Sequence, residues 1–321
     1  MKKNLKIEQV HDLPGNLDAE SIYVLLPKNF SQDFYNERTD RNIGWITKEE
    51  QELLRKSVVG IAGCGGMGGA LAQILLRLGI GEIRIADCET FDISNINRQF
   101  AATRTTVGKS KAFETARFMR NISEDTRIVV YPMGIRADMV EHFVSGCDAI
   151  VDEIEFWELT VAIILHRAAC AAGVEIFGCN TSGFGTHLFR FTPTSMAIEE
   201  AFGVTFEKAQ QIDNARRSNK LSTTEVEKLT NRLLLVVAPE IKNYNPDEFS
   251  EIWRRLFVEG KAPIISTNPS FATGFVADHL LLHLIHHLGN KANTASIPPM
   301  PGYAYLDARK LAAVVVDKKW W

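Results

Sequence analysis

A glycine-rich segment between an apolar run and an apolar helix-like stretch constrains this chain most. The run Val58–Ala62 suits a buried parallel strand, and Gly63, Gly65 and Gly68 follow it with the spacing G-x-G-x-x-G. In that pattern the first glycine allows a tight turn, the second lets a phosphate approach the backbone, and the third lets a helix pack close to its strand. The spacing therefore predicts a strand, a phosphate-binding loop and a helix over residues 68–78, whose N-terminus faces the phosphates.

A second strand and a polar cluster follow the loop. Glu82–Ala86 is expected to be a strand, and Asp87 at its end suits a ribose hydroxyl because it lies about 20 residues past the loop. NAD- and FAD-binding proteins share this much. They have no use, however, for the arginine and the amides within Ser94–Gln99. Because the planar fork of arginine matches phosphate oxygens, the cluster favours a site that handles a triphosphate.

Strand-like and helix-like segments alternate along most of the chain. This alternation predicts an α/β fold built on a doubly wound, largely parallel sheet of Rossmann type. Residues 1–40 are expected to form an N-terminal arm and residues 41–321 one domain, with a charged helical insertion over the site at about 194–260. Further helices are expected over 45–56, 106–121, 140–146, 158–172 and 271–288, and further strands over 22–26, 127–131, 148–151, 174–179, 185–191 and 311–316.

Composition and charge exclude several function classes. The net charge of −3 gives no basic field for nucleic acid, and no polybasic run indicates a membrane surface. The first residues lack a signal-peptide core, and the five cysteines form no C-x-x-C pair, so a cytoplasmic protein with reduced thiols is expected. Val58–Leu76 is apolar enough to span a bilayer, but its glycines favour the nucleotide interpretation.

The loop Cys64–Gly69, together with Asp87, Glu89 and Ser94–Gln99, resembles the adenylating family of ubiquitin-activating-type enzymes, whose bacterial members include the ThiF and MoeB proteins. The resemblance covers about Arg38 to Arg190. It implies an adenylyltransferase that binds ATP and Mg²⁺ and activates a carboxylate of a small protein or peptide acceptor as an acyl-adenylate. The nucleotide-binding residues that it implies are Gly63, Gly65, Gly66, Gly68, Asp87, Glu89, Asn95, Arg98, Gln99 and Lys111.

Adenylation builds charge on phosphoryl oxygens and on the leaving pyrophosphate, so positioned cations and Mg²⁺ are its main catalytic need. Arg98 is the best candidate cation, and the resemblance places the phosphate lysine at Lys111. The family's acidic pattern D-x-x-D-N corresponds here to Asp152, Glu155 and Phe156, where Glu155 replaces the second Asp and Phe156 the amide. The resemblance implies Mg²⁺ ligands at Asp152 and Glu155, with a geometry altered by the longer Glu side chain.

A further arginine points to a second copy of the chain. Arg41 lies in a segment that resembles the family's arm, whose second arginine reaches the nucleotide site of the partner subunit. The resemblance therefore implies a homodimer in which Arg41 acts as an arginine finger. The alternative is an exposed arginine on a flexible arm.

Zinc is not expected. Many bacterial relatives hold a structural zinc with two C-x-x-C pairs, which this chain lacks. His279, His283 and His287 recur with the H-x-x-x-H spacing that can bind zinc, but the leucines between them favour a polar stripe on a packed helix.

Cysteine chemistry is a separate question. Some family members carry the activated product on a cysteine, and Cys179 is nearest in sequence to the expected reacting centre at residues 180–185. Cys64 is expected to be a small buried residue in the glycine loop, and Cys88, Cys147 and Cys170 are expected to be small core residues.

Three other functions remain open. One is an NAD(P)-dependent oxidoreductase, which would leave Ser94–Gln99 unexplained. Another is a non-catalytic nucleotide-binding scaffold, suggested by Glu155 and Phe156. The last is a peptide-tailoring enzyme of microcin or pantocin type that acts on a precursor peptide, against which the short arm argues.

Overall fold

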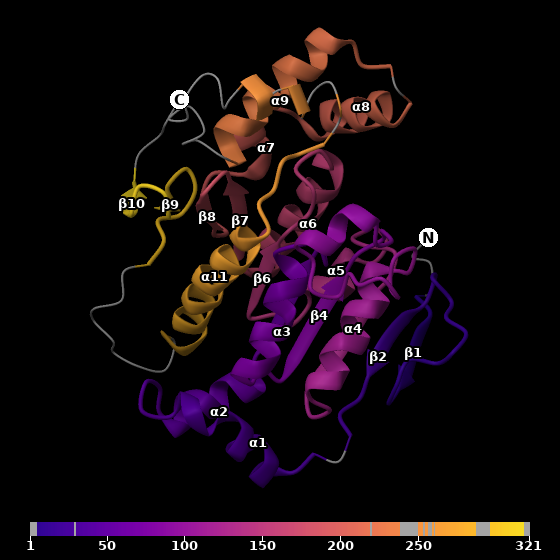
Figure 1. Ribbon diagram of the computed structural model, residues 1–321, viewed down its shortest axis with the longest axis vertical. Helices are drawn as coiled ribbons and strands as arrows, with labels where there is room; N and C mark the ends of the chain where they lie inside the picture. Colours follow the sequence, from indigo (N-terminus) through magenta and orange to yellow (C-terminus); the bar gives the residue numbers. More distant parts are fainter. Residues whose placement is uncertain are drawn as a thin grey trace.

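The central sheet of the computed structural model has its strands in the order β1-β2-β5-β4-β3-β6-β7-β8-β9-β10 (Figure 1). The structure describes residues 5–28, 30–218, 220–237, 250–252, 254–255, 259, 261–286 and 296–317. The strands are β1 Ile7–Val10, β2 Ile22–Leu25, β3 Val58–Ala62, β4 Glu82–Ala86, β5 Arg127–Tyr131, β6 Ala149–Asp152, β7 Ile176–Ser182, β8 Gly185–Phe191, β9 Tyr303–Asp307 and β10 Ala312–Val316.

The strands β5, β4, β3, β6 and β7 form the parallel centre of the sheet. From β3 the chain first adds β4 and β5 on one side, and it then returns to place β6 and β7 on the other. The carboxyl ends of β3 and β6 therefore flank the point where the winding reverses, which is where ligands bind in open α/β sheets. In the register of these two strands, Ala62 lies opposite Asp152.

Helices cover both faces of the sheet because successive strand residues point to opposite sides. Ile61 and Ile85 pack into one core with α3, α4 and α11, whereas Ala62 and Ala86 pack into the other with α5 and α6. This arrangement confirms the doubly wound α/β fold. These helices are α3 Gly68–Leu78, α4 Lys111–Ile122, α5 Val140–Val144, α6 Leu159–Ala172 and α11 Thr267–His286.

The N-terminal segment is part of the sheet and not a separate arm. β2 pairs antiparallel with β5, and β1 pairs with β2 at the edge. Tyr23 and Leu25 are almost fully buried, so this segment closes the core. The segment continues into α1 Gln32–Thr39, the short helix η1 Asp40–Asn42 and α2 Lys48–Lys56.

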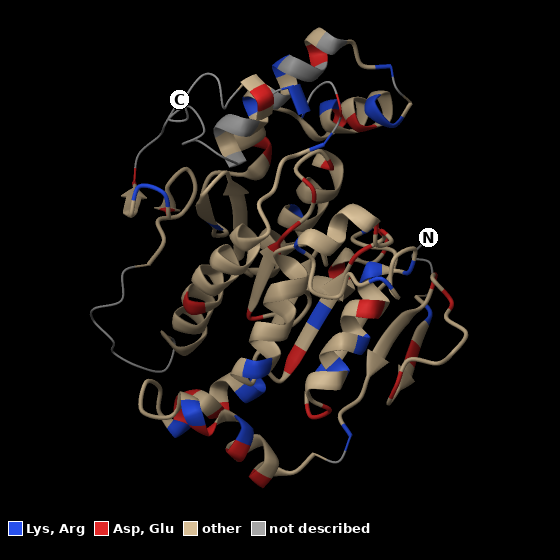
Figure 2. Ribbon diagram, viewed as in Figure 1, with Lys and Arg blue, Asp and Glu red and all other residues tan. Residues whose placement is uncertain are grey.

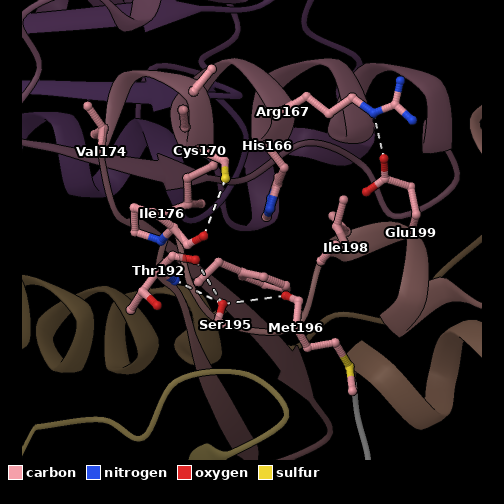
Figure 3. Close-up of a pocket in the computed structure, with 15 residues that line it drawn as sticks. His166, Arg167, Cys170, Val174, Ile176, Thr192, Ser195, Met196, Ile198 and Glu199 are labelled. Atoms are coloured by element: carbon pink, nitrogen blue, oxygen red, sulfur yellow. Dashed lines mark hydrogen bonds and ion pairs between the residues drawn. The ribbon is translucent and has the colours of Figure 1, made fainter.

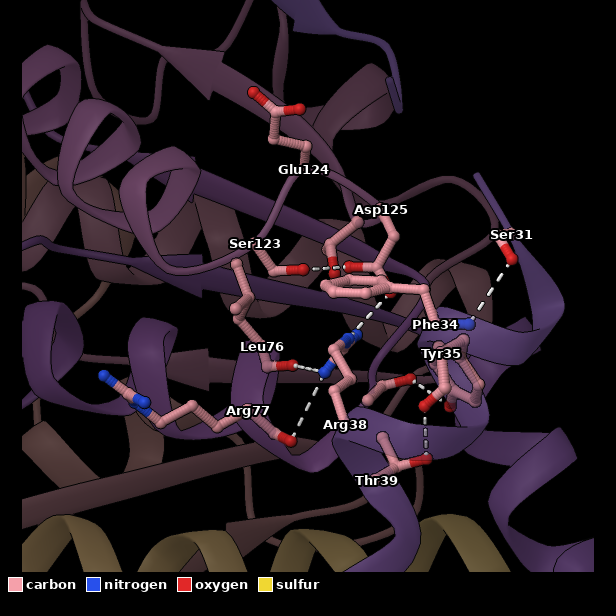
Figure 4. A network of polar contacts seen from close by, with 12 residues as sticks. Ser31, Phe34, Tyr35, Arg38, Thr39, Leu76, Arg77, Ser123, Glu124 and Asp125 are labelled. Carbon is pink, nitrogen blue, oxygen red and sulfur yellow. Dashed lines mark hydrogen bonds and ion pairs between the residues drawn. The ribbon is translucent and has the colours of Figure 1, made fainter. Parts of the chain in front are cut away.

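Arg38 fixes α1 to the end of α3 (Figure 4). Its Nε donates to Asp125 Oδ2 at 2.7 Å, and a terminal nitrogen donates to the carbonyl of Leu76 at 3.0 Å. A cation at a helix C-terminus also offsets the negative end of the helix dipole. The Nε and Nη1 atoms of Arg38 therefore have structural partners, whereas its buried Nη2 has no hydrogen-bond partner among the described residues.

The helical insertion begins after β8 and is rich in charge (Figure 2). Its described helices are α7 Ile198–Phe202, α8 Phe206–Arg217 and α9 Thr223–Val237. Several details differ from the sequence expectation, among them β1 and α1, which were not anticipated, and α11, which begins before residue 271. The helix expected over 106–121 begins only at Lys111, because Gly108 takes a φ of +82° and the Ser110 side chain then caps the helix. The strand β9, which pairs β8 with β10, was not anticipated. Among the described residues, no helix is both long and apolar enough to cross a bilayer.

Candidate nucleotide-binding site

The glycine loop connects β3 to α3 at the reversal point of the sheet. Gly63 has a φ of +108°, and a Cβ there would lie 2.3 Å from the carbonyl oxygen of Glu153. A Cβ on Gly68 would lie 1.9 Å from the carbonyl oxygen of Gly63. Both positions therefore exclude a side chain. Met67 precedes α3 without a side-chain cap, so no side chain competes with an anion for the first turn of the helix, although the Gly69 N–H donates to the Gly65 carbonyl at 3.1 Å.

Asp87 fixes this loop from the end of β4. One carboxylate oxygen accepts the Cys64 N–H at 2.7 Å, and the other accepts the Glu89 N–H at 2.8 Å. Burial raises the pKa of Asp87, although these two hydrogen bonds oppose the shift. The residue lies where the sequence predicts, but its oxygens already hold backbone, and its contact with a ribose stays a prediction.

The polar cluster lies against the glycine loop, on and after the short helix η2 Ile93–Asn97. A Cβ on Gly66 would be 3.5 Å from Cγ of Arg98, and one on Gly65 would be 3.8 Å from Nε2 of Gln99. Gln99 is buried, and its Oε1 has no hydrogen-bond partner within the described part of the chain. A buried acceptor without a partner costs free energy, so this oxygen can accept a hydrogen bond from a ligand at the loop.

The side chain of Asn95, within the polar cluster, forms a hydrogen bond to the backbone. Its Oδ1 accepts the Asp92 N–H at 2.9 Å and closes a capping box around η2. This contact shapes the turn that carries Arg98 and Gln99, while a direct contact of Asn95 with nucleotide stays a prediction.

Arg98 and Lys111 differ in how their charges are balanced. The Arg98 guanidinium donates to Asn97 Oδ1 at 2.9 Å, and within the described residues no carboxylate lies within 4.0 Å of it. Burial lowers its pKa, and the Glu155 carboxylate opposes that shift. Lys111 is buried at the start of α4, with Nζ 2.6 Å from Oε2 of the exposed Glu89. Arg98 is therefore the cation of the pair that lacks an anion at contact distance.

The acidic segment after β6 completes the site. The charges of Glu89, Lys111 and Arg98, and that of Arg216 on α8, all act on the Glu155 carboxylate. Limited hydration inside the surrounding protein raises the pKa of Glu155, Glu89 adds to the rise, and Lys111 and Arg98 oppose it. A joint site of Arg98, Lys111 and Glu155 stays a prediction, supported by these electrostatic interactions.

Asp152 has a partner that the sequence does not reveal. Its Oδ2 lies 2.9 Å from Nε2 of His166 on α6, and its Oδ1 accepts the Ile154 N–H at 3.0 Å. His166 is buried and lies fourteen residues further along the chain, so no local motif links the two. Among the described residues, no group of three or more His, Cys, Asp or Glu side chains is placed to hold a metal ion.

The N-terminus of α11 reaches the glycine loop from the other side of the site. Pro269 lies 3.3 Å from the Cβ position of Gly66, and Asn268 donates to the carbonyl of Gly183 at 2.6 Å. Asn268 therefore ties the turn between β7 and β8, where the reacting centre is expected, to the glycine loop. The Asn-Pro pair at the start of a helix was the only sequence signal for this contact.

The insertion holds the segment that follows Glu155. The buried Asp213 on α8 accepts the backbone N–H of Thr160 at 2.8 Å, which caps the start of α6. Arg216 and Arg217 both form ion pairs with Glu158. We name these contacts between α8 and residues 158–160 the α8 clamp. They are long-range, so the sequence offered no signal for them.

The histidines of α11 and the cysteines have mostly structural surroundings. His283 packs on the ring of Phe177, with Nδ1 3.7 Å from Glu175, and His279 packs on Phe275, while His287 lies outside the described residues. The absence of a structural zinc stays a prediction.

Cys179 is buried, and burial raises the pKa of its thiol well above the usual value, which argues against a reactive thiolate. Cys64 and Cys147 are buried as expected. The expectation that Cys88 and Cys170 are core residues is wrong, because both are exposed at the ends of their elements.

Arg41 is exposed on η1, next to the C-terminus of α3, where the neighbouring Asn42 donates to the carbonyl of Leu78 at 3.2 Å. The glycine loop lies at the opposite end of α3. A helix of this length spans about 16 Å, so Arg41 is far from the loop of its own chain.

Comparison with known proteins identifies the family. The model of the ThiF family matches residues 39–314. The chain is 34% identical over 113 residues to tRNA threonylcarbamoyladenosine dehydratase of Bacillus subtilis, covering 35% of this chain and 44% of that protein. It is 29% identical over 138 residues to the sulfur carrier protein ThiS adenylyltransferase of Bacillus subtilis, covering 42% and 40%. The matched segments thus span less than half the length of each of these relatives.

Solved structures share the fold over most of the chain. The structure of PaaA covers 91% of this chain and 77% of its own, with a TM-score of 0.58 at 17% identity. The structure of Escherichia coli MccB covers 89% and 70%, with a TM-score of 0.58 at 14% identity. Together with the family match over residues 39–314, the glycine loop and the doubly wound sheet, this shows that the chain belongs to the ThiF family.

Proposed function

We propose that this protein is an ATP-dependent adenylyltransferase that activates a carboxylate of a small protein or peptide. An oxygen of the acceptor carboxylate attacks the α-phosphorus of ATP and forms a new P–O bond. The bond from that phosphorus to the oxygen shared with the β-phosphate breaks, and its electron pair leaves with pyrophosphate. The products are an acyl-adenylate and pyrophosphate. The observation that carries the proposal is the position of Arg98 and Gln99 against a glycine loop that leads into a helix without a side-chain cap.

Each part of the site takes a role that fits its surroundings. The backbone of Gly63, Gly65, Gly66 and Gly68 and the first turn of α3 receive the phosphates. Asp87 and Asn95 hold the turns that face the ribose, and the unpartnered Oε1 of Gln99 accepts a hydrogen bond from the nucleotide. Arg98 neutralises the charge that develops on the phosphoryl oxygens, and Lys111 assists from the start of α4, where Glu89 orients it.

Magnesium fits the site if ATP supplies most of its ligands. Mg²⁺ commonly binds through one or two carboxylates together with substrate phosphates and water. Glu155 is exposed, whereas the carboxylate of Asp152 is engaged by His166 and by the Ile154 N–H. When bound there, Mg²⁺ would neutralise charge on the phosphates, and His166 would hold the carboxylate of Asp152 in place.

The acceptor is the less defined half of the proposal. The ThiS adenylyltransferase that resembles this chain is named for a sulfur carrier protein, which supports a small protein acceptor. MccB was solved together with MccA-N7isoASN, which supports a peptide-tailoring variant of the same chemistry. We assign the choice of acceptor to the insertion at about 194–260 within the domain 41–321, because its α8 clamp holds the segment after Glu155.

A homodimer completes the proposed site. Since Arg41 lies at the far end of α3 from its own loop, it would serve the site of a second copy. The five cysteines are all free, which fits a reducing compartment such as the cytoplasm.

Nucleotide choice tests the proposal first. Only a ligand that binds the native state raises the thermal midpoint, so ATP with Mg²⁺ should raise it and NAD should not. Mass spectrometry of a cell extract incubated with the protein and labelled ATP should then reveal an adenylated acceptor, with release of pyrophosphate. Stabilisation by NAD alone would favour the oxidoreductase, and ATP binding without pyrophosphate release in the presence of any extract would favour the scaffold.

A further inference from the structure

A cavity of about 360 Å³ lies next to the proposed site, between α6, the start of β7, the end of β8 and the segment 192–199 that leads into α7 (Figure 3). We name it the α6 pocket. Its apolar lining includes Val174, Ile176, Phe191, Met196 and Ile198. A cavity of this size can take one large side chain together with part of its backbone.

The polar groups of the α6 pocket already have partners. Ser195 Oγ accepts the Thr192 N–H at 3.0 Å, and the Cys170 thiol points to the carbonyl of Pro193 at 3.5 Å. At the rim, the Arg167 guanidinium lies 2.6 Å from Glu199. An anionic or strongly polar ligand would have to break these contacts, so the α6 pocket favours an apolar group.

The α6 pocket shares a wall with a smaller cavity at the proposed site. His166, Phe191 and Ile198 line the α6 pocket and also a smaller cavity, of about 60 Å³, that contains Asp152, Glu155 and Asn180. The His166 ring packs edge-on against Phe191, with 4.6 Å between ring centres, while its Nε2 contacts Asp152. A group in the α6 pocket would therefore touch the residue that orients Asp152.

We propose that the α6 pocket binds an apolar side chain of the acceptor polypeptide, close in sequence to the carboxylate that is activated. This inference rests on the proposed function, because the shared wall with the adenylation site is the reason to choose the acceptor as occupant. A side chain bound there would hold the acceptor in place. Its contact with His166 would couple occupancy of the pocket to the position of the Asp152 carboxylate. The occupant is aliphatic or aromatic, since the lining is mainly apolar and Ser195, Cys170 and the Nε of Arg167 already have partners.

A filling variant tests the pocket without disturbing the core. Ala197 is exposed, lines the α6 pocket and makes no side-chain cap at the start of α7, so Ala197→Phe places a ring into the opening. Ala172, at the exposed end of α6, does not line it, and Ala172→Phe is the matched control. Ala197→Phe should raise the KM for the acceptor roughly 10-fold or more, the effect expected when an apolar side chain loses its site, with the ATP-induced thermal shift retained.

Direct binding tests the chemistry before any acceptor is known. With isoleucine methyl groups labelled for NMR, N-acetyl-L-phenylalaninamide should shift the Ile176 and Ile198 signals saturably, and N-acetyl-L-aspartamide should not. The shifts should vanish in Ala197→Phe and persist in Ala172→Phe. No saturable shift, or equal shifts with both probes, would overturn the pocket.

The two proposals fail in different ways. Loss of probe binding in Ala197→Phe with an unchanged acceptor KM would overturn the acceptor as occupant and leave a site for a free apolar molecule. Absence of any ATP-induced stabilisation in the wild-type protein would instead count against the adenylation proposal itself, whatever the probes do.

Discussion

The glycine-loop site and the α8 clamp differ in whether their arginines form ion pairs. At the loop, Arg98 has no carboxylate at contact distance among the described residues. In the clamp, Arg216 and Arg217 each pair with Glu158, and Asp213 caps a helix. The clamp also has buried polar atoms without a hydrogen-bond partner among the described residues, at Thr160, Asp213 and Arg216, so the two regions differ in the pairing of their charges. An unpaired cation costs stability and persists where a ligand completes it, whereas paired charges hold the fold. The contrast separates a binding site from the scaffold beside it.

The largest expected effect comes from replacing Arg41, which we propose to reach the nucleotide site of a second copy of the chain. Arginines supplied in trans to a phosphoryl group can contribute on the order of 10³-fold in rate, so Arg41→Ala should reduce pyrophosphate exchange by a similar factor. Arg77→Ala, at the same end of α3, is the control and should have little effect.

Subunit mixing then tests the trans geometry of Arg41. In a dimer of one Arg41→Ala and one Arg98→Ala subunit, a single site regains both arginines. Activity should return to about a quarter of the wild-type level at statistical mixing, since half of the dimers are mixed and each has one intact site. No recovery despite confirmed subunit exchange, or a protein that stays monomeric, would remove Arg41 from the mechanism.

The next largest effect is expected for Arg98, the cation of the glycine-loop site. Arg98→Ala should lower acceptor-dependent pyrophosphate exchange about 10²-fold or more, because it removes a charge positioned for the transition state. The unfolding midpoint should change little, since no ion pair at contact distance is lost among the described residues. Arg104→Ala, an exposed arginine just beyond the cluster, is the matched control. Near-native exchange in Arg98→Ala would place the residue with the scaffold.

These contrasts also explain what the sequence predicted. Val58–Ala62, Glu82–Ala86 and Arg127–Tyr131 lie where periodicity placed strands, because buried parallel strands read as short apolar runs. The grouping of Arg98 and Lys111 near the loop followed from local spacing within one nucleotide-binding unit.

Contacts that join distant parts of the chain left no local signal. His166 meets Asp152 only because α6 packs over β6, and Asp213 reaches Thr160 across more than fifty residues. The strand β9 was missed because Tyr303–Asp307 gains its order by pairing with β8 and β10. The N-terminal segment was interpreted as an arm because a four-residue strand has too few residues to indicate its partner in the sheet.

A smaller effect is expected in the α8 clamp. Asp213→Ala removes the cap of α6 and should lower the free energy of unfolding by about 1 kcal/mol, measured by urea denaturation. Asp213→Asn keeps an acceptor for the Thr160 N–H and should lose less. ATP should still raise the thermal midpoint of both variants, because the loop site is separate. Loss of ATP-induced stabilisation in Asp213→Ala would show that the clamp belongs to the nucleotide site.

The smallest expected effect concerns Glu155 and its contribution to the stability of the protein without nucleotide. Limited hydration raises the folded-state pKa of Glu155, so the folded chain holds this proton more readily than the unfolded chain does. The contribution of Glu155 to stability therefore falls as pH rises through the region above the unfolded pKa. Without nucleotide or divalent metal, Glu155→Gln should be more stable than wild type near neutral pH, and the difference should shrink toward about pH 4. Glu200→Gln, on the exposed side of α7, is the control. If the wild type were instead the more stable protein at neutral pH, Arg98 and Lys111 would already satisfy Glu155 without ligand. The glycine-loop site would then be paired like the α8 clamp, and the contrast between them would fail.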